Sequence, residues 1–272
     1  MFDRGQEVPI VSFEAGARFD TRSVPVWLVV ICNERGKIGG SAQFAGKESL
    51  FRPALNELDK HDTIGVAHWC DNGEARLDLP PTVDRDTPIS VLAETIRPIP
   101  FTAGMNTSAS GEARFRKLVR LIIQDAQHRN PQPLPVIVFL DGDYTVQPPR
   151  ELDELVDDFL ETSGIVFGIK DHDSPRVPRL SWEQEEILHY MADQTGGQYF
   201  SASPSGYAAA LDAILMQLHF RYELGFMPPA IDGKRHELKI ELTTEAKERN
   251  KGIRLRYRTE YIPLAETSAW VH

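Results

Sequence analysis

The chain has 272 residues, of which 41% are hydrophobic and 26% charged, and its formal net charge is −10 at pH 7. This composition is ordinary for a soluble globular protein, and the length suits one large domain or one domain with an appendage. The negative charge argues against a nucleic-acid partner and against an anionic membrane surface. No apolar run approaches the roughly 20 residues that span a bilayer, and charges interrupt the N-terminal region, so we expect neither a transmembrane segment nor a signal peptide.

Apolar strands and amphipathic helices alternate along most of the chain. In chain order, the pattern predicts a strand at 24–32, a helix at 46–58, strands at 63–70 and 75–79, helices at 88–96 and 113–127, a strand at 136–140, a helix at 151–161, a strand at 164–170, a helix at 182–194, a strand at 198–200 and a helix at 207–219. The Asn72-Gly73 turn favours a hairpin between the second and third strands. Such alternation predicts an α/β fold with a doubly wound, mostly parallel, Rossmann-like central sheet and helices on both faces.

From Phe220 onward the pattern changes to the period of two that is typical of antiparallel strands. The predicted strands of a C-terminal antiparallel β extension are RYELGF, HELKIELTT and RLRYRTEYI. The predicted division is an N-terminal extension at 1–22, the α/β domain at 23–219, the β extension packed on it at 220–265, and a tail at 266–272.

The stretch VWLVVICNERGK, at 26–37, is an apolar strand that runs directly into a polar turn. A nearly continuous apolar run of this kind indicates a central strand of a parallel sheet. Ligands of such sheets lie beyond the carboxyl ends of the strands. The turn with Asn33, Arg35 and Lys37 is therefore where we expect a binding site.

Cys32 and Cys70 are the only cysteines, and each lies near the end of a predicted strand. Cysteine at such positions usually behaves as a small hydrophobe, so inert core thiols are favoured over a disulfide or a reactive thiol. His68 shares a strand face with Cys70, but no orienting acid is evident, which favours a histidine in the core or at the rim of a cleft. Asp171-His172-Asp173 could ligate a metal, although a solvated loop is the favoured interpretation.

The order of these elements resembles that of a von Willebrand factor type A domain. The resemblance is carried by the 26–37 strand and turn, the hairpin DTIGVAHWCDNGEARLDLPPT, the polar loop and helix that follow, and the strand VIVFLDGD. The segment ILHYMADQTGGQYFSASPSGYAAALDAILMQLHFRYELGFMPP and the basic β segment after it are similar to the A-domain-related proteins abundant in acidobacteria. The resemblance spans about Ser23 to Pro263. It implies a bacterial protein-binding module, exported or periplasmic if it is made with a leader and cytoplasmic otherwise.

Type A domains typically carry a metal-ion-dependent adhesion site. In that site the first strand ends in Asp-x-Ser-x-Ser, a later loop gives a threonine, and the fourth strand ends in an aspartate. This oxygen-only set suits Mg²⁺, whose shell a carboxylate of the partner completes. Here Asn33 replaces the first aspartate, and Arg35 and Lys37 replace the two serines. Thr107 best matches the loop hydroxyl, with Asn106 nearly as good, and Asp141 matches the last acid.

These replacements predict a degenerate site that binds no divalent metal. Asparagine carries no charge, and arginine and lysine have no acceptor atom. A cation about 4 Å from Mg²⁺ would cost roughly 4 kcal/mol per charge at a surface-like dielectric. Either Arg35 or Lys37 could pair with Asp141 instead. We therefore expect no cofactor.

We expect a protein partner to bind at the rim of this degenerate site by charge pairing and hydrogen bonding. The rim residues are Asn33, Arg35, Lys37, Thr107, Asp141 and Asp143. A second possibility keeps protein binding but moves the interface to the β extension. The sequence predicts neither the identity of the partner nor the oligomeric state.

The enzyme alternative uses the same strand, because VIVFLDGDYT fits the strand-then-DxDxT pattern of haloacid-dehalogenase-type phosphatases. Asp141 would be the nucleophile and Asp143 the acid/base, with Mg²⁺ bridging to phosphate. The residues available for the remaining roles are Ser163, Lys170, Asp171 and Asp173. That family starts with this strand, whereas about half of this chain precedes it, and so short a match is common by chance. A non-enzymatic module is therefore favoured.

Overall fold

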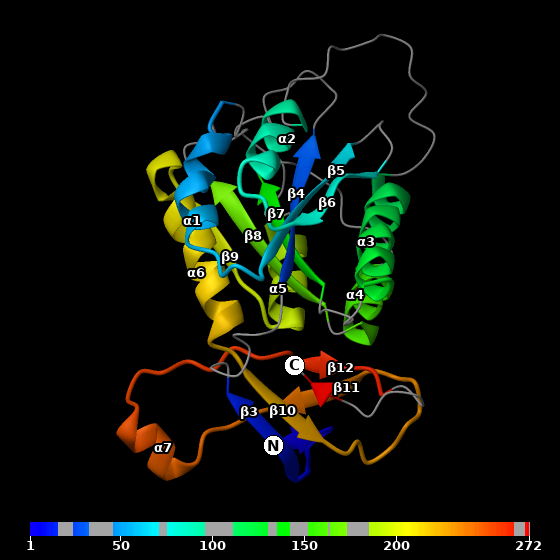
Figure 1. Cartoon of the computed structure of the whole chain (residues 1–272). Coiled ribbons are helices and arrows are strands. Elements are labelled where there is room, and N and C mark those ends of the chain that lie inside the picture. Colours follow the sequence, from blue (N-terminus) through cyan, green and yellow to red (C-terminus); the bar gives the residue numbers. More distant parts are fainter. Residues whose placement is uncertain are drawn as a thin grey trace.

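The computed structural model describes residues 1–15, 24–32, 46–70, 75–95, 111–129, 135–141, 152–162, 164–172, 185–263 and 270–271. Figure 1 shows two parts, an α/β body in which helices surround a sheet and a smaller β layer beneath it. Within the described ranges, no helix is long and apolar enough to cross a membrane.

Six strands form the sheet of the body, in the order β6-β5-β4-β7-β8-β9. Their bounds are β4 (Pro25–Cys32), β5 (Thr63–Cys70), β6 (Arg76–Thr82), β7 (Val136–Asp141), β8 (Ile165–Asp171) and β9 (Tyr199–Ala202). β6 pairs antiparallel with β5, and all other neighbours are parallel. The predicted doubly wound sheet with one hairpin strand is confirmed. The strand order reverses between β4 and β7, which makes their carboxyl ends the topological switch point.

Helices cover both faces of this sheet. One face, here called the α6 face, carries η3 (Glu48–Phe51), α1 (Arg52–Asn56), α2 (Thr87–Thr95) and α6 (Tyr207–His219). The opposite face, here called the α3 face, carries α3 (Gly111–Gln127), α4 (Leu152–Glu161) and α5 (Glu185–Thr195). The helix predicted at 46–58 is broken into η3 and α1, because Pro53 has no N–H and favours a new helix start.

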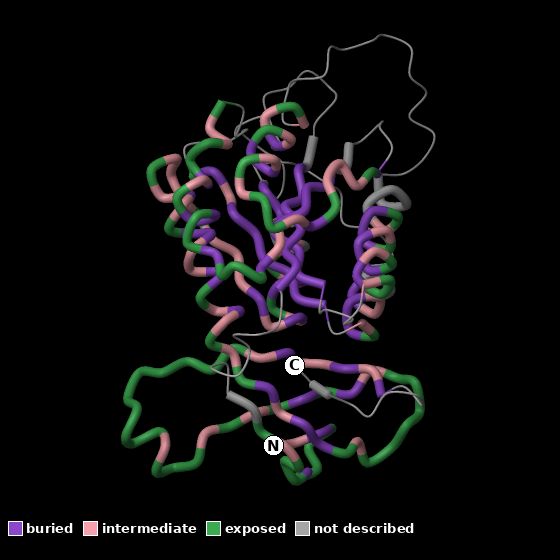
Figure 2. The backbone as a smooth tube through the Cα atoms, viewed as in Figure 1, coloured by how far each residue is buried: buried purple, intermediate pink, exposed green. Residues whose placement is uncertain are grey.

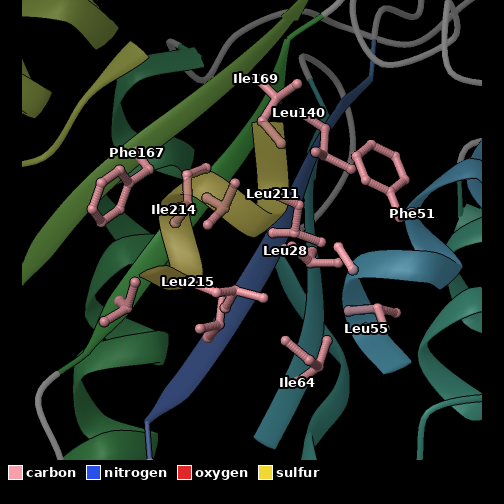
Figure 3. Packing of buried hydrophobic residues seen from close by; sticks show 14 of the residues in the cluster. Leu28, Phe51, Leu55, Ile64, Leu140, Phe167, Ile169, Leu211, Ile214 and Leu215 are labelled. Atoms are coloured by element: carbon pink, nitrogen blue, oxygen red, sulfur yellow. The ribbon is translucent and has the colours of Figure 1, made fainter. Parts of the chain in front are cut away.

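Alternate strand residues fill the two halves of the core. In β4, Leu28 packs on the α6 face with Phe51, Leu55 and Leu211 (Figure 3). Trp27 packs on the α3 face instead. Figure 2 shows the resulting buried centre of the sheet between its two helical layers. Burial on both faces explains why the strands are apolar at nearly every position.

The smaller layer takes strands from both ends of the described chain. Its two sheets have the orders β12-β11-β1-β2 and β13-β10-β3, with antiparallel pairing throughout. The bounds are β1 (Phe2–Asp3), β2 (Gln6–Glu7), β3 (Ile10–Ala15), β10 (Tyr222–Phe226), β11 (His236–Lys239), β12 (Glu260–Tyr261) and β13 (Trp270–Val271), with α7 (Thr244–Arg249) between β11 and β12. The sequence predicted the C-terminal part of this layer and missed the N-terminal strands.

The strand predicted at RLRYRTEYI is wrong, except that Glu260–Tyr261 near its end form β12. Arg258, which is buried, donates from Nη1 to the carbonyl of Leu160 and from Nη2 to that of Gly164, both at 3.2 Å. Burial lowers the pKa of Arg258 to about 10, and the positive charge of Arg221 makes a smaller contribution in the same direction. The segment before β12 is therefore fixed by side-chain contacts to the end of α4, and it forms no ladder with a neighbouring strand.

A buried polar cluster ties the two chain ends together in the layer. His236 Nδ1 lies 3.0 Å from both carboxylate oxygens of Asp3, and its Nε2 lies 3.0 Å from Asp232 Oδ1. The Tyr261 hydroxyl donates to Asp3 Oδ2 at 2.7 Å. Burial and this bond to Asp3 raise the pKa of Tyr261. The amide N–H of Lys234, with His236 and Arg4, holds the pKa of Asp232 at about 2.

Candidate functional site

The candidate site is the carboxyl edge of the central sheet, where β4 and β7 end at the switch point. Of the predicted rim residues, only Asp141 is described, as the last residue of β7. Its backbone is in register with Lys170 of β8.

The remaining predicted rim residues lie outside the described residues. They are Asn33, Arg35, Lys37, Thr107 and Asp143. Asn106, the alternative to Thr107, also lies outside them, as do Ser163 and Asp173 of the phosphatase alternative. The pairing of Arg35 or Lys37 with Asp141 therefore stays a prediction. The prediction that this donor set does not suit Mg²⁺ rests on the sequence alone, because arginine and lysine have no acceptor atom.

A second carboxylate at this edge is already paired with a lysine. Asp171, at the end of β8, has a fully buried side chain, and Lys47 Nζ lies 2.8 Å from its Oδ2. Lys47 comes from the turn before η3 and keeps about a third of its side chain exposed. His172 follows Asp171, and its Nδ1 lies 3.3 Å from Ser201 Oγ. The interpretation of Asp171 as part of a solvated loop is therefore wrong, because its carboxylate is buried in an ion pair.

Replacing Lys47 by methionine is expected to lower the free energy of unfolding by about 2 kcal/mol, less than the 3–5 kcal/mol typical of a fully buried pair. The loss arises because the buried Asp171 carboxylate loses its ammonium partner. Adding Asp171→Asn removes that charge. The double variant should therefore be more stable, by at least about 1 kcal/mol, than the sum of the two single-variant stability losses predicts.

Urea unfolding followed by circular dichroism measures this coupling. Lys60→Met is the matched control, because Lys60 is exposed, and it should change stability by no more than about 0.5 kcal/mol. Strict additivity of the Lys47 and Asp171 effects would show that the pair contributes nothing to stability.

His68 has the orienting acid that the sequence did not reveal. His68 Nδ1 lies 2.6 Å from Oδ2 of Asp78, a largely buried residue of β6, and Arg76 contacts the other oxygen of that carboxylate at 2.8 Å. His68 is itself largely buried, with 15% of its side chain exposed. The hairpin places the pair, since Arg76 is in register with His68. A two-residue turn at Asn72-Gly73 would instead pair His68 with Leu77, so the predicted hairpin gave no register signal for Asp78.

Comparison with known proteins identifies the fold. No protein-family model and no curated protein sequence matches the chain. Among solved structures, it is similar to an aerotolerance-related membrane protein from Bacteroides fragilis, with 15% identity and a TM-score of 0.51 over 72% of this chain and 98% of that one. It is also similar to BatB from Bacteroides thetaiotaomicron (14%, TM-score 0.48, 72% and 97%) and to the VWA domain of SpRpn10 (15%, TM-score 0.45, 72% and 95%).

The body therefore belongs to the doubly wound α/β class, and its fold is von Willebrand factor type A-like. This confirms the predicted resemblance at the level of the fold. The loss of the metal site stays a prediction. The comparisons give no support to the phosphatase alternative.

Proposed function

We propose that this chain is a non-enzymatic protein-binding or scaffolding module that uses the carboxyl-edge surface without a divalent metal. Protein interaction is the typical role of domains with this fold. The observation that carries the metal-free part is the Lys47–Asp171 pair, in which a lysine neutralises a buried carboxylate at the end of the strand next to β7. We expect the cations of the turn after β4, Arg35 and Lys37, to extend the same chemistry toward Asp141.

Recognition at this rim would be by direct charge pairing. A cationic turn beside carboxylates offers both signs of charge to a partner, and hydrogen bonds to charged groups are worth about 1.5–3 kcal/mol each. Such contacts need neither a bridging ion nor a chemical step.

The test is capture of a protein partner by the immobilised chain. Arg35→Ala and Lys37→Ala together should weaken capture at least about tenfold, and excess EDTA should leave wild-type capture unchanged. The matched control removes two exposed cations of the β layer, Lys251→Ala and Arg254→Ala, and should leave capture intact. Loss of capture in the control pair alone would move the interface to the β layer and overturn the proposal.

A further inference from the structure

The segment between α7 and β12 carries an exposed concentration of positive charge. Residues 249–257, here called the cationic segment, contain four exposed cations and no acid, in a chain whose net charge is −10. The four are Arg249, Lys251, Arg254 and Arg256. Figure 1 shows the segment leaving α7 along the margin of the β layer, and Figure 2 shows that most of its length is exposed.

These four cations have no acidic partner among the residues that the structure describes, since none of them forms an ion pair there. Arg256 donates from Nη1 to the carbonyl oxygen of Gly197 at 3.5 Å, which leaves its charge unneutralised. Lys239 of the same layer, by contrast, is paired, with its Nζ 2.7 Å from Glu241 Oε1. The charge of the cationic segment is therefore available to a partner.

The backbone of the segment has hydrogen-bonding groups to offer as well. The N–H of Ile253 donates to the carbonyl of Asn250 at 3.2 Å, but from 254 to 257 no backbone group bonds to another backbone group within the described ranges. Pairing with β11 begins at Thr259, whose carbonyl accepts from Leu238 at 2.7 Å. The sequence of the segment nevertheless alternates with the period of a strand. It is a strand-like sequence whose backbone has no neighbouring strand among the described elements.

Exposed apolar side chains alternate with two of the cations. Ile253 is 57% exposed and Leu255 is 40% exposed, and each is followed by an arginine. Alternate residues of an extended chain point to opposite sides, so a peptide strand laid along this segment meets cations on one side and apolar groups on the other. A peptide that alternates acidic with apolar residues has the complementary pattern.

We propose that the cationic segment binds an extended acidic peptide, which adds to it as a strand. Main-chain hydrogen bonds supply the affinity, and carboxylates opposite Arg254 and Arg256 supply the specificity. A short peptide responds mainly to charges within a Debye length, about 8 Å at physiological salt. A membrane or a nucleic acid is favoured less, because so large an anionic surface also meets the acidic remainder of the chain. The site goes beyond the proposed function and does not depend on it.

The test is binding of labelled peptides to the full chain, measured by fluorescence anisotropy. The probe is a peptide of about ten residues that alternates glutamate with valine, which is the pattern of a strand with two different faces. One control peptide replaces each glutamate by lysine, and the other gathers the glutamates into a single block. We expect the alternating acidic probe to bind more tightly than either control. Its affinity should fall at least about tenfold when salt is raised from about 0.05 M to about 0.5 M.

Two double variants separate this site from the carboxyl-edge rim. Lys251→Ala with Arg254→Ala should weaken binding of the acidic probe about fivefold or more, because two of the four exposed cations are lost. Arg35→Ala with Lys37→Ala should leave it unchanged. The two pairs are expected to have the opposite effects on capture at the rim, so failure of this proposal and failure of the proposed function are distinguishable.

The matched control for charge is Lys60→Ala with Lys234→Ala, which removes two exposed cations outside the segment and should bind the probe as the wild type does. Circular dichroism checks that each variant is folded. All the substituted side chains are exposed, so we expect folding to be retained.

N-methylated probes test the strand addition without changing the protein. Backbone N–H groups of a strand point alternately to its two edges, so methylating every second amide blocks one edge only. Methylation of either the glutamate or the valine amides should weaken binding at least about tenfold, and methylation of the other set should have a smaller effect.

Three outcomes would overturn the proposal. One is an acidic probe that binds the Lys251→Ala, Arg254→Ala variant as tightly as the wild type, or does not bind at all. Another is equal binding of the unmodified probe and both methylated probes, which would leave only side-chain attraction. The third is tighter binding to phosphatidylserine vesicles or to single-stranded nucleic acid than to the acidic probe, which would identify the segment as a site for an anionic surface.

Discussion

Replacing Asp3 by alanine is expected to lower the free energy of unfolding by about 3–5 kcal/mol, the range found when one partner of a buried ion pair is removed. Asp3 is fully buried, and it accepts from Tyr261 and faces His236 through both of its oxygens. The Asp3 carboxylate offers acceptor atoms to both the Tyr261 hydroxyl and the His236 ring, and alanine offers none. Without it, a buried imidazole and a buried hydroxyl lose their common partner.

The β layer should report this loss first, because the cluster joins β1, β11 and β12. Urea unfolding followed by circular dichroism gives the free energy of unfolding. Glu7→Ala is the control, since Glu7 is an exposed acid in the adjoining β2 and should cost no more than about 0.5 kcal/mol. An Asp3→Ala variant as stable as Glu7→Ala would show that the cluster does not hold the N-terminal strands.

Replacing Gly197 by alanine is expected to cost about 3 kcal/mol or more. A Cβ atom at this position would lie 1.8 Å from the carbonyl oxygen of Val166, which belongs to the backbone of β8. Because the obstacle is a strand backbone and not a flexible side chain, the clash can be relieved only by moving the sheet or the turn after α5. Overpacking of this kind commonly costs about 1–3 kcal/mol, and a backbone obstacle puts Gly197 at the upper end.

Gly206→Ala is the matched control for this prediction. A Cβ atom there meets Ala202 Cβ at 3.6 Å and Ser203 Oγ at 3.9 Å, both ordinary contacts. We expect Gly206→Ala to stay within about 0.5 kcal/mol of the wild type in thermal unfolding, whereas Gly197→Ala should melt well below it. Equal melting temperatures for the two variants would contradict the placement of the α5–β9 turn against β8.

The α/β body could be predicted closely because its elements are long and strongly patterned. β5 and α6 begin and end at the predicted residues, and the apolar runs of β4, β7 and β8 follow from burial on both faces. The β layer was harder. β1 and β2 have only two residues each, and β1 pairs with β11, more than 230 residues away, so no local pattern marks these strands.

The site was predictable only in its location. Strand order places the switch point beside the turn that the sequence singled out, but Lys47 reaches Asp171 across 124 residues, and no motif connects the two. Asp78 was missed for a different reason. It lies in a hairpin that the sequence did predict, but the pairing of β5 and β6 shifts register between Val66 and Ala67, and no local pattern in the sequence marks that shift.

Calorimetric titration of the full chain with Mg²⁺ tests most directly whether the carboxyl-edge surface acts without a divalent metal. We expect no binding in the micromolar range, and the same trace from wild type and Asp141→Asn, because the two cations of the turn offer no acceptor atoms. Micromolar Mg²⁺ binding that disappears in Asp141→Asn would contradict this account and restore a metal-dependent adhesion site to this edge.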